Sequence, residues 1–268
     1  MRENYLMESD EEALRLDLKT DPRLVEMQAL WSGITAGMRV ADLGCGSGKT
    51  TFILNRLSQP GAVTVGVDIA PQRVRFAKSK YSATGLSFHQ MDIRKPLEAL
   101  GQFDLVWIRF VLEYYRSESF EIVKNIARIV EPGGILCLID LDHNCLNHYG
   151  LTPRLETALE GIMKALEKGA GFDPYAGRKL YAYLYDLGFR DILVDMMPHH
   201  LIYGKLKEAD AFNWTKKVEI AARNSGYPFD EYERGFEGFR SEFEQAFLST
   251  PRRFTYTPVI TCRGRRPA

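Results

Sequence analysis

The sequence predicts a doubly wound α/β fold, in which a mostly parallel sheet carries helices on both faces. From residue 38 onward, short apolar strand patterns alternate with amphipathic helical patterns, which is typical of βαβ units. A glycine-rich turn at residues 44–48 separates the first strand of this series from its first helix. Parallel units joined by right-handed crossovers would assemble into one twisted sheet.

The individual elements follow from hydrophobic periodicity and from the residues that begin and end helices. Strand composition is found in seven segments: residues 38–43, 63–68, 86–92, 103–108, 135–141, 191–197 and 253–262. Helical spacing is found at residues 71–81, 117–130, 153–168 and 174–187. Pro71 suits a first helical turn, and Pro132-Gly133-Gly134 ends the second of these helices. The prediction is therefore a seven-stranded sheet.

Four regions are expected along the chain. Residues 1–35 form an N-terminal helical flap, because Ser9 and Glu12 make the S-x-x-E pattern of a helix start and Pro22 opens a second helix. The sheet core follows over residues 36–150, with a helical insertion over 151–188. Residues 189–268 hold the last two strands, and the aromatic-rich stretch 205–248 between them is too long for a plain loop. We expect that stretch to be a helical lid.

Composition excludes several classes of function. The 268 residues carry 35 basic and 35 acidic side chains, without the positive field usual in nucleic-acid binders. No apolar run approaches the ~18 residues of a membrane span. The absence of a signal peptide and of paired cysteines predicts a reducing, cytoplasmic location. Five arginines close to the C-terminus are expected to be solvated: Arg252, Arg253, Arg263, Arg265 and Arg266.

The most informative segment is the string ADLGCGSGKT at residues 41–50, which follows a strand and opens a helix. A phosphate-binding P-loop would need one more residue before Gly48-Lys49-Thr50, and a dinucleotide fingerprint would place its third glycine one position later. The observed pattern is G-x-G-x-G, preceded by the acidic Asp42. That pattern resembles motif I of the class I S-adenosylmethionine-dependent methyltransferases.

The resemblance extends over about residues 38–141 and implies S-adenosyl-L-methionine as the cofactor. Asp68 ends the second strand, where the family binds the ribose; Asp92 follows the third strand, where the family binds adenine. Arg109 leaves the fourth strand, near the methionine end, and Tyr5 and Arg15 resemble a flap over that end. The full set implied for the cofactor is Asp42, Gly44, Cys45, Gly46, Gly48, Asp68, Ile69, Met91, Asp92, Ile93, Arg109, Tyr5 and Arg15.

The acceptor is expected to be a small organic molecule. The residues 108–111 do not form the [DNS]-P-P-[YF] string of enzymes that methylate amino groups in DNA, and Arg109 stands where catechol-type relatives have a metal-binding aspartate. His143 leaves the fifth strand and is a candidate general base for the acceptor's proton. The segment 140–148 holds two carboxylates, two histidines and a thiol, but we interpret it as a polar loop and expect no metal.

Other interpretations stay open at this point. Methylation of RNA or protein is one, with the C-terminal arginines as contacts, and a non-catalytic S-adenosylmethionine-binding protein is another. A nicotinamide oxidoreductase is disfavoured by the glycine spacing. His199, His200, Trp214 and Tyr227 could face an acceptor, although ordinary packing is the simpler role for such residues.

Overall fold

Five parallel strands form one half of the sheet, as the sequence predicted. The computed structural model describes residues 10–268, so Tyr5 and Ser9 lie outside the described residues. The parallel strands are β1 (Arg39–Leu43), β2 (Val63–Asp68), β3 (Leu86–Gln90), β4 (Phe103–Arg109) and β5 (Val130–Leu141). Their carboxyl ends meet at one edge, where ligands bind in open α/β sheets.

Two long antiparallel strands, β7 (Arg190–Tyr203) and β8 (Phe254–Arg265), complete the sheet. The order is β3-β2-β1-β4-β5-β8-β6, with β7 also paired to β8. The seven predicted strands are all present, and the eighth is the two-residue β6 (His148–Tyr149). Strand β6 exists only because the chain after β5 returns to pair with Thr255 and Phe254, which no local pattern indicates.

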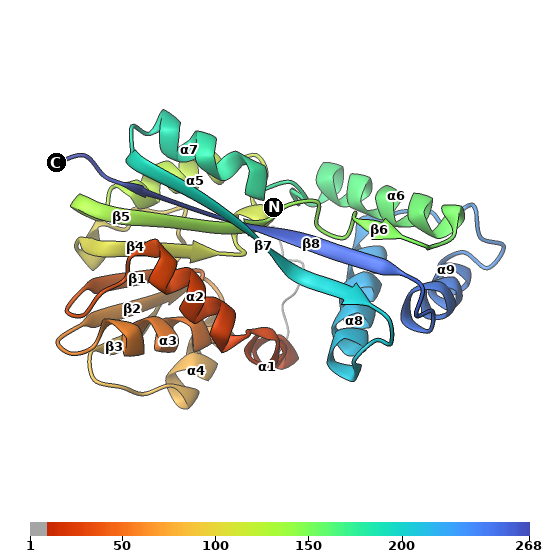
Figure 1. The fold of residues 1–268 in the computed structure, drawn as a ribbon, viewed down its shortest axis with the longest axis horizontal. Helices are drawn as coiled ribbons and strands as arrows, with labels where there is room; N and C mark the ends of the chain where they lie inside the picture. Colours follow the sequence, from red (N-terminus) through yellow and green to blue (C-terminus); the bar gives the residue numbers. More distant parts are fainter. Residues whose placement is uncertain (1–9) are drawn as a thin grey trace.

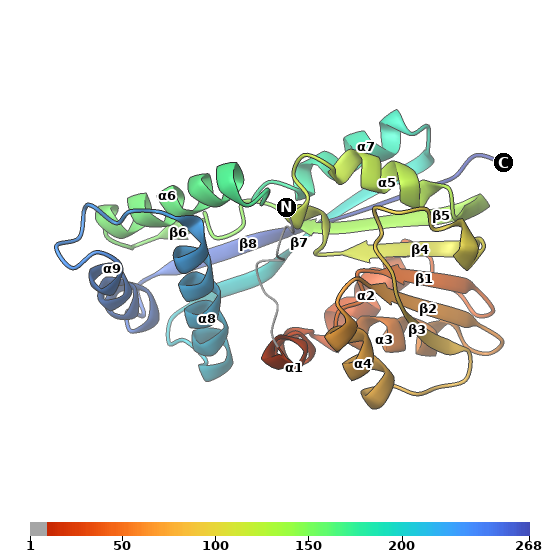
Figure 2. The same cartoon turned by 180° about the vertical axis from the view of Figure 1, so that it is seen from behind.

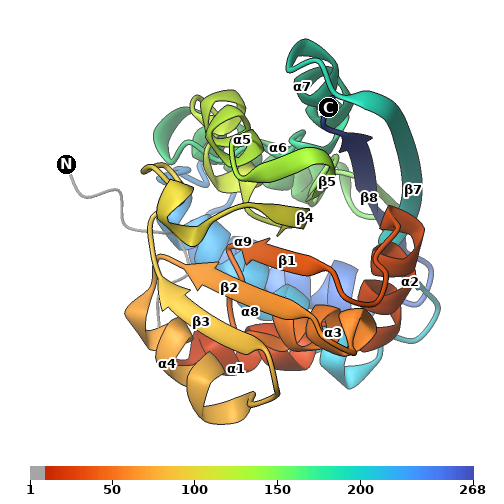
Figure 3. The same cartoon turned by 90° about the vertical axis from the view of Figure 1, so that its left-hand side faces the viewer.

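Helices cover both faces of the sheet because successive strand residues point to opposite sides. In β4, Leu105 and Trp107 pack in the same core as residues of α2 and α3, whereas Val106 and Ile108 pack with residues of α5 and α7. Figure 3, which looks along the molecule, shows the two helical layers with the twisted sheet between them. These helices are α2 (Pro22–Ser32), α3 (Lys49–Ser58), α4 (Pro71–Lys80), α5 (Ser119–Ala127) and α7 (Leu180–Asp186).

A second helical group packs beside the far halves of β7 and β8 (Figures 1 and 2). It consists of α6 (Pro153–Gly169), α8 (Glu208–Ser225), α9 (Phe236–Glu242) and a π-helical turn at Phe243–Leu248. Trp214, Phe239, Phe243 and Phe247 are buried in its core, so packing is their role. Helix α1 (Asp10–Lys19) lies between this group and the sheet. The predicted division of the chain into four regions stays a prediction.

Two sequence expectations were wrong in detail. Strand β5 begins at Val130 and α5 ends at Ala127, whereas a helix to residue 130 and a strand from 135 were expected. Val130 pairs with Phe103 across a bulge, and the Gly133 amide donates to the Arg266 carbonyl at 2.9 Å, so the glycines bend a strand instead of ending it.

The C-terminal arginines are not all solvated. Arg253 is only 1% exposed, and its Nη1 donates to the carbonyls of Gly204 and Thr250 at 2.8 and 3.0 Å. Arg266 donates to the carbonyl of Val130 at 2.5 Å. These guanidinium groups therefore form hydrogen bonds with backbone carbonyls of loops and of a strand end. Among the described residues, no helix is both long and apolar enough to cross a membrane.

Candidate functional site

The glycine-rich turn closes tightly over the end of β2. The amides of Gly44 and Cys45 both donate to the Val67 carbonyl, at 2.7 and 2.9 Å. Gly44 has φ +79°, and a Cβ on it would lie 2.3 Å from Cγ2 of Val111. Glycine suits this position because it lacks a Cβ, so it adopts a positive φ without strain and leaves room for the Val111 side chain. The turn therefore packs closely against the chain after β4, and the two together border a space in front of the turn.

Asp68 is fixed at the edge of that space. Its Oδ2 accepts from the Gly46 amide at 2.9 Å, and its Oδ1 accepts from the Ala70 amide at 2.9 Å. Nη1 of Arg73 lies 3.8 Å from the same Oδ1. The carboxylate at the end of β2 thus holds the glycine turn and also lines the space in front of it.

The space is a pocket of about 870 Å³, including the part continuous with solvent, within the range of small-ligand sites. Nine of the predicted cofactor residues line it: Asp42, Gly44, Cys45, Gly46, Asp68, Ile69, Met91, Ile93 and Arg109. The other lining residues were not predicted from the sequence; they are Leu16, Thr20, Ser47, Thr50, Arg73, Phe110, Val111, Tyr114 and Tyr115. We call this space the first pocket.

Where β1 and β4 border the first pocket, an acidic and a basic side chain, Asp42 and Arg109, line it. Asp42 is 2% exposed and accepts from the Thr51 hydroxyl at 2.7 Å. Burial raises the pKa of Asp42 to about 7, although the Thr51 bond and the charge of Arg109 act to lower it. Burial also lowers the pKa of Arg109 to about 10, and its Nε donates to Oε1 of Gln28 at 3.1 Å.

Asp42 should make the protein less stable as the pH rises. A folded-state pKa near 7, above the unfolded value of 3.8, means that the proton on Asp42 favours folding below pH 4. That contribution is lost progressively up to about pH 7 and amounts to at most about 4 kcal/mol. Asp42→Asn should remove it, flattening the free energy of unfolding between about pH 4 and 8. Denaturant unfolding at a series of pH values tests this, and equal pH slopes for both proteins would contradict it.

Asp92 lies outside the residues that line the first pocket, unlike its neighbours Met91 and Ile93. Its carboxylate accepts from the Arg94 backbone amide and from Nε and Nη2 of the Arg94 side chain, at 3.0, 3.0 and 2.9 Å. Burial acts to raise the pKa of Asp92, but the hydrogen bonds and charge of Arg94 outweigh it and lower that pKa. In this arrangement Asp92 shapes the turn after β3.

Asp92→Asn should therefore weaken cofactor binding less than about threefold, because the carboxylate is already bound by Arg94. Calorimetric titration with S-adenosylhomocysteine, the demethylated product of the expected cofactor, measures the effect. A loss of tenfold or more would instead assign Asp92 a direct contact with the ligand.

The rest of the glycine motif serves packing. Gly48 begins α3, and a Cβ there would lie 2.7 Å from Cβ of Ala77 and 2.9 Å from the Phe88 ring. Gly48 therefore allows α3 to pack closely on α4 and β3. Lys49 turns away from the loop, and its Nζ donates to the Asp17 carbonyl at 2.8 Å. This lysine holds α1 in place, which agrees with a motif that is one residue short of a phosphate loop.

A second pocket of about 930 Å³, again counting its solvent-continuous part, adjoins the first and shares Leu16, Phe110 and Tyr114 with it. Arg15 lines this second pocket and not the first. Phe110 has φ +58°, an uncommon value for a non-glycine residue, and the Arg109 guanidinium lies 4.0 Å from its ring centre. Because Phe110 lines both pockets, this unusual backbone conformation lies at their junction.

The candidate acceptor residues lie elsewhere. His143 lines neither pocket; its Nε2 is 3.9 Å from Asp142, and its ring packs on Tyr175. His199 and His200 are enclosed side by side, and burial lowers the pKa of each, that of His200 to about 2. Tyr227 donates to Glu231 at 2.9 Å and packs over Gly161, away from both pockets. Imidazoles whose pKa values lie this far below 7 are weak bases and therefore poor proton acceptors.

The second pocket is the main functional feature that the sequence did not predict. Lys19, Glu113 and Lys217 line it, and they come from three separate segments, α1, the turn after β4 and α8. No motif connects them. In contrast, Ser47, Thr50 and Tyr115 lie within or beside the quoted motifs, so their positions could have been inferred. Among the described residues, no group of three or more histidines, cysteines or carboxylates could hold a metal ion.

Comparison with known protein families gives a match over the glycine turn and the five parallel strands. The model of the family described as "Methyltransferase domain" matches residues 34–174. The chain is 42% identical over 98 residues, 35% of its length and 41% of the relative's, to magnesium-protoporphyrin O-methyltransferase of Rhodobacter capsulatus. It is 28% identical over 140 residues, 51% of its length and 59% of the relative's, to ubiquinone biosynthesis O-methyltransferase of Dechloromonas aromatica. The matches span about half the length of these curated relatives.

Solved structures share the fold at low identity. Phosphoethanolamine N-methyltransferase 2 of Haemonchus contortus, in complex with S-adenosyl-L-methionine, matches with a TM-score of 0.59 at 13% identity over 97% of this chain and 58% of that one. The [4+2]-cyclase SpnF matches with a TM-score of 0.53 at 18% identity over 92% and 82%. The family match covers more than half of this chain, and the fold agrees with it. The chain therefore belongs to the class I S-adenosylmethionine-dependent methyltransferase family.

Proposed function

We propose that the protein binds S-adenosyl-L-methionine in the first pocket and transfers its methyl group to a small organic acceptor in the second. The observation that carries the proposal is the space in front of the glycine turn. A Cβ at position 44 would lie 2.3 Å from Val111, and one at position 46 would lie 3.3 Å from Leu16, so glycine lets the turn approach the opposite wall of the pocket that it lines.

The residues of the first pocket suit the chemistry of this cofactor. Asp68 can accept from two ribose hydroxyls in addition to the backbone amides that it already binds. Met91 and Ile93 offer apolar contacts for an adenine ring. Asp42 and Arg109 present opposite charges where β1 and β4 border the pocket. These charges are complementary to the ammonium and carboxylate groups of an amino acid.

The reaction needs positioning more than it needs a catalytic residue. When bound, the cofactor supplies an electrophilic methyl group on a sulfonium sulfur. The protein must hold the acceptor next to that group and keep water out. The second pocket adjoins the first along Leu16, Phe110 and Tyr114, so an acceptor there would be next to the first pocket's ligand. The relatives named for porphyrin and ubiquinone methylation support a small acceptor.

Two measurements test the proposal separately. S-adenosylhomocysteine should bind with micromolar affinity in calorimetric titration, and reduced nicotinamide dinucleotide should show no binding in a fluorescence titration. Transfer of a radiolabelled methyl group to members of an acceptor panel tests catalysis, which fold similarity leaves open because the cyclase SpnF shares the fold. Absence of S-adenosylhomocysteine binding would refute the proposal, whereas binding without turnover across the panel would favour a non-catalytic role.

A further inference from the structure

We infer that the second pocket binds an amphipathic organic monoanion, with a single oxyanion head group beside Lys19 and Lys217 and an apolar body between α6 and α8. The inference rests on the proposed function and names the class of its acceptor. Its basis is the composition of the pocket wall, which separates into a charged end and an apolar end.

The charged end has more cations than anions. Arg15 and Lys19 come from α1 and Lys217 from α8, and Glu113 is the one carboxylate among the residues that line the pocket. Lys217 Nζ donates to Oδ1 of Asn144 at 2.6 Å. Within residues 10–268, the Lys19 ammonium has no hydrogen bond or ion pair. A half-buried ammonium that no described residue neutralises favours an anion beside it.

Glu113 limits the charge of that anion. The Glu113 side chain is 4% exposed, and its Oε2 accepts from Nδ2 of Asn144 at 2.7 Å. Arg15 takes part in an interaction of its own, so the charge balance is counted over Lys19, Lys217 and Glu113. With both lysines charged and Glu113 ionised, one positive charge remains. A monoanion balances that charge, whereas a phosphate dianion would exceed it by one. We therefore assign a carboxylate or phenolate head group.

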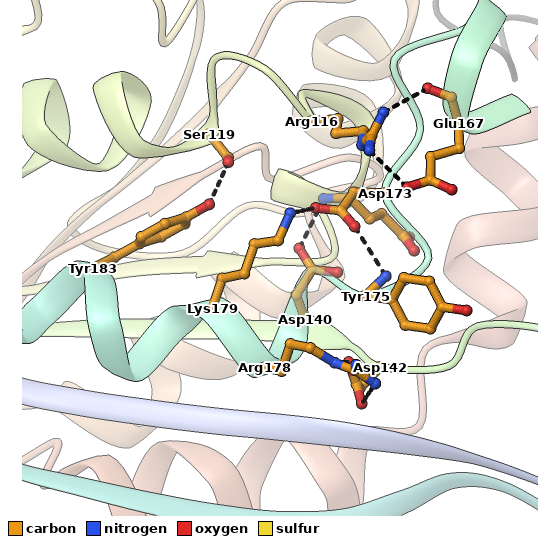
Figure 4. A network of polar contacts seen from close by, with 11 residues as sticks. Arg116, Ser119, Asp140, Asp142, Glu167, Asp173, Tyr175, Arg178, Lys179 and Tyr183 are labelled. Carbon is orange, nitrogen blue, oxygen red and sulfur yellow. Dashed lines mark hydrogen bonds and ion pairs between the residues drawn. The ribbon is translucent and has the colours of Figure 1, made fainter. Parts of the chain in front are cut away.

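A polar network holds Glu113 and Asn144 in place behind the pocket. The Glu113 amide donates to Asp140 at 3.1 Å, and its carbonyl accepts from the Asp173 amide at 2.7 Å. Asp173 also pairs with Lys179 and accepts from the Tyr175 amide at 3.0 Å (Figure 4). The charged end is thus preorganised by segments that take no part in the first pocket.

The apolar end comes mainly from α6 and α8, with further residues from the end of β5 and from loops. Its wall consists of Leu141, Cys145, Leu159, Met163, Leu166, Phe172, Val218, Ile220 and Ala221. Arg15 and Lys19 flank the shared residue Leu16, and Glu113 precedes the shared residue Tyr114. The head group would therefore lie toward the first pocket and the apolar body away from it. Each methylene buried there adds to the affinity.

The pH response follows from the groups around Lys19. Burial is the main cause that lowers the pKa of Lys19 to about 7, and the positive charges of Lys217, Arg15 and Arg109 lower it further. The negative charge of Glu113 acts in the opposite direction and raises that pKa. Burial raises the pKa of Glu113. Burial keeps the nearby His199 and His200 neutral. As the pH rises through 7, Lys19 loses its charge and Glu113 gains or keeps its own, so anion affinity should fall.

The experiment uses decanoate, with decanol and decylammonium as matched ligands that differ only in the head group. Calorimetric titration of the S-adenosylhomocysteine-loaded protein should show binding of decanoate, at least about tenfold tighter than decanol, and no binding of decylammonium. Acetate should bind much more weakly than decanoate, because it lacks the apolar body. A hydrophobic phenol acidic enough to ionise below pH 7, compared with decanoate at a pH where Lys19 is charged, distinguishes a phenolate site from a carboxylate site.

Lys19→Gln and Lys217→Gln should each weaken decanoate binding about tenfold or more, and Lys19→Gln should also remove the loss of affinity above pH 7. Lys216→Gln is the matched control, because Lys216 is exposed beside Lys217 and the change in net charge is the same. It should change decanoate affinity less than about twofold. S-adenosylhomocysteine affinity should stay unchanged in all three variants.

The outcomes separate the two proposals. Failure of the unmodified protein to bind S-adenosylhomocysteine would refute the proposed function. Normal S-adenosylhomocysteine binding together with equal affinity for decanoate and decanol, or with equal decanoate affinity in the Lys19 and Lys216 variants, would refute the oxyanion site alone. Loss of thermal stability in a variant is detected by its melting curve, and the ligand series on the unmodified protein decides the question in that case.

Discussion

Replacing Asp68 with alanine is expected to weaken S-adenosylhomocysteine binding on the order of a hundredfold or more. The carboxylate lines the first pocket and would accept from two ribose hydroxyls, each charge-assisted bond contributing about 1.5–3 kcal/mol. It also holds the Gly46 amide at 2.9 Å, so alanine would loosen the turn on which the ligand lies. Calorimetric titration gives the affinity, and denaturant unfolding gives the accompanying loss of stability.

Asp104→Ala is the matched control for this variant. Asp104 also accepts a hydrogen bond from a backbone amide, that of Arg39 at 2.7 Å, but it lies near the start of β4 and outside the first pocket. The control removes a carboxylate and a comparable backbone bond, so its stability should fall while S-adenosylhomocysteine affinity stays within about twofold. Equal affinities for the unmodified protein and the Asp68 variant would show that the cofactor site has been wrongly placed.

Gly44→Ala is expected to lower the free energy of unfolding by about 2–4 kcal/mol and to abolish detectable S-adenosylhomocysteine binding. Two effects add. The backbone at φ +79° is unfavourable for any residue with a Cβ, and that Cβ would lie 2.3 Å from Cγ2 of Val111. Relief requires either the turn or the chain after β4 to move, and both line the first pocket.

Two further variants separate the contributions. Gly37 has φ +83°, and a Cβ there would meet no atom within 4 Å, so Gly37→Ala measures the backbone effect alone, about 1 kcal/mol. In the double variant Gly44→Ala/Val111→Ala the close contact is removed, and the loss of stability should be smaller than the sum of the two single losses. Simple additivity would show that Val111 does not restrict position 44.

The sheet and the first pocket could largely be predicted because their signals are local. The alternation of strand and helix patterns indicated the fold, and the resemblance to the methyltransferases indicated nine of the residues that line the first pocket. Parallel pairing places the carboxyl ends of β1, β2 and β4 at one edge, so residues that end these strands lie close together. Asp92 shows the limit of this inference, because Arg94, two residues later, binds its carboxylate.

Local sequence patterns determined the family, the parallel core and the glycine turn of this protein, since a few adjacent residues specify a turn and a strand end. Tertiary structure alone brought Lys19, Glu113 and Lys217 to one pocket, and it moved His143 away from both pockets. Their positions depend on how α1, the turn after β4 and α8 pack against each other. Contacts between segments far apart in the chain have no periodicity or spacing that a single sequence could reveal.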